Sequence, residues 1–146
     1  MTTLSLDHFL PSGREASDVG AALEVAGATR IALVAACVTI EDHRLTSEAC
    51  GDAEGARLTA EAAARLKARA VTIWNTIAAL KALDPTWTAE RDKALDTRLE
   101  AMAADATNGR WMLDMAADFL KIALSEVRLS AMEAAASQVA EVADAG

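Results

Sequence analysis

Hydrophobic residues recur at intervals of three and four positions along most of this chain, which is the spacing of a helix with one apolar side. No segment shows the apolar–polar alternation that indicates a half-buried strand. The pattern therefore predicts an all-α fold: an antiparallel bundle of about four long helices, preceded by an N-terminal arm over residues 1–13. We expect residues 1–146 to form one domain, because this length suits a single hydrophobic core.

The most apolar stretch spans residues 20–40 and is interrupted only by Glu24 and Arg30. Apolar positions cover most of its helical surface, and a helix of that kind is usually buried on most sides. We therefore expect it to be the central helix of the bundle. Gly20 and Gly27 lie one heptad apart within it, which indicates either a close approach to a neighbouring helix or glycines tolerated in a well-packed one.

Three further helices are predicted, over about residues 56–83, from Asp84-Pro85 to about residue 107, and from about residue 110 to residue 143. Asp84 is expected to cap the third helix, with Pro85 at its first position. Asn108-Gly109 is expected to be the turn before the fourth helix.

Trp74 is expected to fill a groove in the core. The core stripes of the second and fourth helices are expected to be Leu58, Ala62, Leu66, Ala70, Ile73, Ile77 and Leu80, and Leu113, Ala116, Leu120, Ala123, Val127 and Ala131. The tail, residues 132–146, has few large apolar side chains, so we expect it to fray or to pack only in an oligomer.

Residues 42–55 are rich in acidic residues and glycine and are expected to form a loop. Side chains that could take part in catalysis or binding are concentrated between Glu41 and Glu54, and the candidate site residues are His43, Glu48 and Asp52. The alternative interpretation is a solvated connection. No metal-ligand spacing, activated nucleophile or phosphate-binding loop occurs in the sequence, so we assign no catalytic, metal or cofactor-binding residue and expect no cofactor.

Composition narrows the class of partner. The formal net charge of −8 disfavours binding to nucleic acid and to anionic membranes. Alanine is the most frequent residue, and because its side chain buries little area, we expect extra burial in a homo-oligomer. Cys37 and Cys50 have no disulfide or metal spacing, which fits the reducing cytoplasm. Residues 1–13 lack the pattern of a signal peptide, and the uncharged apolar run 31–40 is too short to cross a bilayer, so we expect no transmembrane segment.

These features favour a non-catalytic helical module for protein–protein interaction or assembly, such as a chaperone, an adaptor or a structural component. One alternative is an enzymatic or small-molecule-binding bundle that uses the Glu41–Glu54 loop. The other is a protein that attaches to a lipid or granule surface through amphipathic helices.

Overall fold

Four helices account for nearly all of the described part of the chain, residues 19–145 of a computed structural model. They are α1 (Val19–Ala49), α2 (Ala53–Ala82), α3 (Ala89–Ala104) and α4 (Ala106–Ala145). No strand occurs among the described residues, so the prediction of an all-α bundle is confirmed. The arm predicted over residues 1–13 lies outside them.

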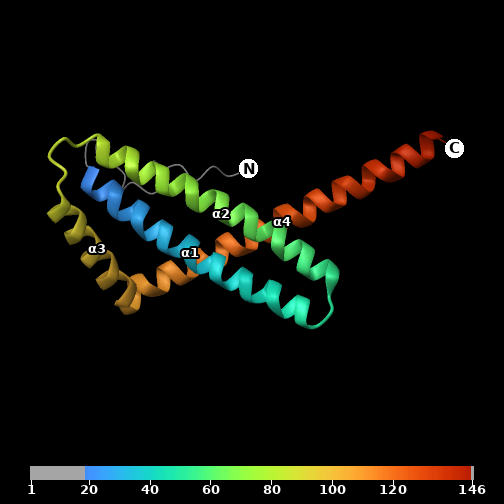
Figure 1. The fold of residues 1–146 in the computed structure, drawn as a ribbon, viewed down its shortest axis with the longest axis horizontal. Helices are drawn as coiled ribbons and strands as arrows, with labels where there is room; N and C mark the ends of the chain where they lie inside the picture. The colour runs from blue at the N-terminus through green and yellow to red at the C-terminus, as the bar shows by residue number, and fades with distance from the viewer. Residues whose placement is uncertain (1–18, 146) are drawn as a thin grey trace.

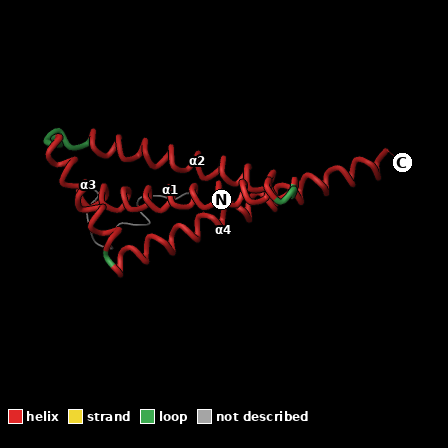
Figure 2. Tube along the Cα trace, turned by 60° about the horizontal axis from the view of Figure 1, so that its bottom comes forward, coloured by secondary structure: helices red, strands yellow, loops and turns green. Residues whose placement is uncertain are grey.

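Helices α1 and α2 form an antiparallel hairpin, α4 crosses both of them, and α3 lies at one end (Figure 1). The connections between the helices are short (Figure 2). α1 contacts each of the other three helices and supplies the fully buried side chains of Leu23, Leu33 and Ile40. It is therefore central to the bundle, as its apolar composition predicts.

The main core is formed by the inward-facing side chains of α1, α2 and α4. Its buried members on α2 and α4 are Ala62, Ala63, Leu66, Ile73 and Ile77, and Ala116, Phe119, Ala123 and Val127. The predicted α2 stripe is confirmed, but Leu113 of the predicted α4 stripe is exposed and Met112 is buried in its place. A second cluster joins α1 to α3 and α4 through Ala28, Leu99 and Met112. At this contact, a Cβ on Gly27 would lie 2.5 Å from Leu99 Cδ1, so Gly27 permits the close approach of α3 to α1.

The prediction of an acidic loop over residues 42–55 is wrong, because residues 42–49 continue α1. Arg44 stabilises these turns by pairing with Glu41 and Glu48, one helical turn away on either side. α1 ends where Gly51 takes a left-handed φ of 75°. There, Asp52 N donates to Ser47 O and Gly51 N donates to Glu48 O, which is the Schellman arrangement.

The predicted start of the third helix at Asp84-Pro85 is also wrong. Those residues form a turn in which Asp84 Oδ1 accepts hydrogen bonds from Thr86 N and Thr86 Oγ1. α3 begins later, where Thr88 Oγ1 accepts a bond from Arg91 N. A hydroxyl at this position satisfies a free amide of the first helical turn, and Asp84 is already engaged in the turn before it.

Asn108 and Gly109, predicted to form the turn before the fourth helix, lie inside the first turn of α4. The break falls instead at Asp105, whose Oδ2 accepts hydrogen bonds from Thr107 N and Asn108 N. Glycine and asparagine are typical of turns, but here the aspartate that precedes them supplies the helix cap, and the turn moves to its position.

α4 extends well beyond the other three helices (Figures 1 and 2). From Met132 to Ala143 every residue is exposed. This part of α4, which we call the α4 extension, is helical throughout residues 132–145 and does not share in the core. The tail is therefore helical and lies outside the core, and both expectations for it, fraying and packing in an oligomer, stay predictions.

Candidate functional site

The predicted site residues are placed at the junction of α1 and α2, and each is exposed. His43 and Glu48 lie five positions apart on α1, which separates their directions by about 140° around the helix axis. Glu48 Oε1 accepts a hydrogen bond from Arg44 Nη1 at 2.6 Å. Asp52 lies beyond the end of α1, and its Oδ1 accepts from Gly55 N at 2.9 Å, capping α2. Glu48 and Asp52 each make a local structural hydrogen bond, and His43 lies on a different side of α1 from Glu48.

Two neighbouring acidic residues, Glu41 and Glu54, are also held in ion pairs. The hydrogen bond from Arg44 lowers the pKa of Glu41, and the one from Arg57 lowers the pKa of Glu54. A carboxylate held ionised in this way is a poor general base at neutral pH. Among the described residues, no three histidine, cysteine or acidic side chains converge as ligands of a metal ion.

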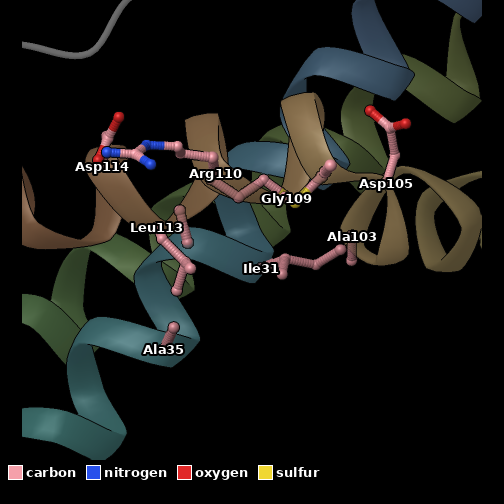
Figure 3. A pocket seen from close by; sticks show the side chains of 11 residues that line it. Ile31, Ala35, Ala103, Asp105, Gly109, Arg110, Leu113 and Asp114 are labelled. Carbon is pink, nitrogen blue, oxygen red and sulfur yellow. The ribbon is translucent and has the colours of Figure 1, made fainter.

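One depression on the described surface is an open groove of about 570 Å³ between α1 and the start of α4. Figure 3 shows Ile31 and Ala35 of α1 facing Leu113 of α4 across it. Three charged residues line the groove, Asp105, Arg110 and Asp114, and Asp105 accepts a hydrogen bond in the cap of α4. The remaining described lining is apolar or glycine, so the groove suits an apolar side chain.

Exposed large apolar side chains are the main unexplained feature of the surface. They include Val34, Val38, Leu45, Val71, Trp74, Leu83, Trp111, Leu113, Ile122, Leu129, Met132, Val139 and Val142. Single exposed apolar residues are common on soluble proteins, whereas contiguous groups mark contact surfaces. Two groups in this set are contiguous by helix geometry.

The first group, the hairpin patch, consists of Val34 and Val38 on α1 with Val71 and Trp74 on α2. The guanidinium carbon of Arg30 lies 4.6 Å from the centroid of the Trp74 ring, which fixes the register of the two helices. Val34 is one turn after Arg30 and Val71 is about one turn before Trp74, so antiparallel pairing brings them to the same level. Trp74 is 56% exposed, and the prediction that it fills a core groove is wrong.

The second group, the outer stripe, consists of Leu129, Met132, Val139 and Val142 on α4. Residues two apart differ by about 200° around a helix, so Leu129 lies on the opposite side from the buried Val127. Around the helix axis, Met132 and Val139 lie within about 80° of Leu129, and Val142 lies about 140° from it, so the stripe drifts around α4 towards its end. Each of the four is more than half exposed.

α4 thus changes its apolar side where it leaves the bundle. Along the bundle the outward side carries the charged Asp114, Lys121 and Arg128 together with the partly exposed Trp111 and Ile122, and beyond the bundle it carries Met132 and Val139. The core-facing side changes in the reverse sense, from Phe119 and Val127 to Ser137 and Glu141. A helix that merely continued the bundle would keep one apolar side, so the α4 extension is suited to a contact other than its own core.

Helix α1 is also long and apolar enough to cross a membrane by the measures of length and composition. Half of its most apolar window is buried inside the bundle, and the core helix of a globular protein passes the same test. The prediction of no transmembrane segment rested on the shorter uncharged run, residues 31–40, and stays a prediction.

Neither protein-family models, nor curated proteins, nor solved structures include a match to this chain.

Proposed function

We propose that this protein is a non-catalytic interaction or assembly module that binds protein through apolar helix surfaces. The observation that carries the proposal is the side change of α4, which leaves the outer stripe exposed on a helix outside the core. Exposed apolar surface costs free energy in water, and its burial by a partner is the usual compensation. The hairpin patch, on α1 and α2, is a second exposed apolar surface and supports the same role.

The thiols and the charge fit this proposal. Cys37 is half-buried, Cys50 is exposed, and both are free. Burial raises the pKa of the Cys37 thiol, which makes it less reactive. We propose a reducing, cytoplasmic location for the protein on this basis, with protein rather than nucleic acid as its partner given the net charge of −8.

Site-specific photo-crosslinking in the cell of origin tests the proposed role. Benzoylphenylalanine at Val71 or at Val139 should give a discrete crosslinked protein band. The same residue at Ala134, which is exposed on the other side of the α4 extension, is the matched control and should give none. Equal crosslinking at all three positions, or at none, would contradict a role in specific protein binding.

Attachment to a lipid surface is the second candidate, and the length and apolar composition of α1 favour it. In that case the bundle would open and α1 would insert into the bilayer. Flotation with neutral and with anionic vesicles separates the two candidates. Co-migration of the intact chain supports the lipid candidate, and its absence from both vesicle fractions removes it.

A further inference from the structure

We infer that the partner of the outer stripe is a second copy of this chain, with the two α4 extensions paired antiparallel about a two-fold axis. The inference rests on the proposed interaction role and names its partner. In the outer stripe, Met132 is 68% exposed, Val139 is 70% exposed and Val142 is 73% exposed. A helix of this length without tertiary contacts is only marginally stable in water, so a contact along the stripe would also stabilise the helix.

Self-pairing is geometrically simple because the outer stripe is interrupted by small residues. Ala135 and Ala136 lie between Met132 and Val139 on the same side of α4, near the middle of the stripe. Alanines at the centre of a helix pair let the two backbones approach closely, while the larger residues on either side interlock. A two-fold axis near these alanines places Leu129 of one copy against Val139 and Val142 of the other.

The charges favour the antiparallel arrangement over the parallel one. Arg128 is exposed at the start of the outer stripe and lies on the same side of α4. Antiparallel pairing places the two Arg128 side chains at opposite ends of the contact, far from each other. Parallel pairing would instead place Arg128 against Arg128, where like charges repel.

The contact area sets the strength of the association. Leu129 to Ala145 is about 24 Å of helix at 1.5 Å per residue, and a strip about 10 Å wide on each copy gives several hundred Å² in total. Stable complexes bury about 1,200–2,000 Å², and smaller interfaces belong to transient contacts. The pairing should therefore be reversible, with a dissociation constant in the micromolar range.

Sedimentation velocity on the full chain, from about 1 to about 500 μM, tests the inference. The average mass should rise with concentration from that of one chain towards that of two. Val139→Glu should weaken the association at least tenfold, because it places a charge in the outer stripe. Ala134→Glu adds the same charge to the other side of the α4 extension and should change the association less than twofold.

Three outcomes would overturn the inference: one chain at every concentration, equal weakening by both variants, or growth beyond two copies. The first of these leaves the crosslinking experiment above to decide the broader interaction role, so the two proposals can fail separately. Orientation is tested with benzoylphenylalanine at Val142. Crosslinks to the region around Arg128 of the second copy support antiparallel pairing, and crosslinks to the region around Val142 contradict it.

Discussion

Single side chains at the α1–α2 junction serve the fold. Asp52 caps α2, Glu48 pairs with Arg44, and His43 is exposed. The sequence shows that acidic residues lie near the start of the second helix. It does not show that these residues are already engaged in local hydrogen bonds, as Asp52 is with Gly55 N. Residue type and spacing suggest a cluster, whereas the direction of each side chain depends on where α1 ends.

The role of Asp52 as a helix cap gives a direct prediction. Asp52→Ala should lower the free energy of unfolding by about 0.5–2 kcal/mol, because the Gly55 amide loses its acceptor. Asp52→Asn should cost much less, since asparagine caps helices about as well. Urea unfolding followed by circular dichroism measures both. Equal losses in the two variants would mean that the charge of Asp52, and not its capping bond, matters.

Gly27 gives a second prediction at this scale. Gly27→Val should lower the free energy of unfolding by about 1–3 kcal/mol, because branched atoms would be forced against Leu99. Gly27→Ala should be milder, since the Leu99 methyl group can move and alanine gains up to about 1 kcal/mol in helix propensity. The double variant Gly27→Val with Leu99→Ala should recover part of the loss. No recovery in chemical denaturation would show that the α1–α3 contact is not the cause.

At the scale of the elements, the number of helices and the central position of α1 follow from periodicity, but several boundaries do not. The predicted loop at 42–55 contains charges that pair at helical spacing, so the polar segment continues α1. The breaks at Asp84-Pro85 and Asn108-Gly109 shifted by a few residues because Thr88 and Asp105 supply the caps. Turn-forming residues show that a break is near, and hydrogen bonding decides its position.

The turn between α2 and α3 should make stability depend on pH. Bonds from Thr86, followed by Arg91, lower the pKa of Asp84 from 3.8 to about 2. A carboxyl with a lowered pKa in the folded state contributes stability above its unfolded pKa, and this contribution is lost as pH falls towards 2. Asp84→Asn should therefore reduce stability at pH 6 and flatten its decline between pH 4 and pH 2. Urea unfolding across that range checks this, and an unchanged slope would contradict it.

The contact between α2 and α4 depends on a half-buried ion cluster. Glu126 pairs with Arg69 and, at 3.5 Å, with Arg65. Glu126→Gln should cost about 1–3 kcal/mol, because the partly buried Arg69 loses its counter-charge. Glu133→Gln, on the exposed α4 extension, is the matched control and should change stability by less than about 0.5 kcal/mol. Thermal unfolding of both variants measures the difference, and equal effects would rule out a role for the cluster.

At the scale of the whole molecule, the chain combines a bundle with a helix that leaves it. The sequence predicts the bundle well, since Leu66, Ile73 and Val127 occupy the core as their spacing requires. It does not predict which apolar residues stay outside. Val38 and Trp74 lie on apolar stretches like the core residues, and their exposure is decided by the way the helices pack.

The two candidate contact surfaces, the hairpin patch and the outer stripe, are therefore harder to predict from the sequence than the core is. The side change of α4 could have been found from the order of residues, because Val127 and Leu129 cannot face the same way on one helix. The sequence does not show where α4 leaves the bundle. Without that boundary, the residues of the outer stripe are predicted to belong to a broad core-facing side of the helix.

Hydrogen–deuterium exchange at several protein concentrations tests the central claim, which is a bundle around α1 with an α4 extension that packs on a partner. We predict slow exchange for residues 22–40 at every concentration. Residues 132–143 should exchange rapidly in dilute solution and become protected as concentration rises, and Val139→Glu should abolish that protection. Strong protection of residues 132–143 at every dilution would show that they pack on their own bundle, and rapid exchange of residues 22–40 would contradict the central position of α1.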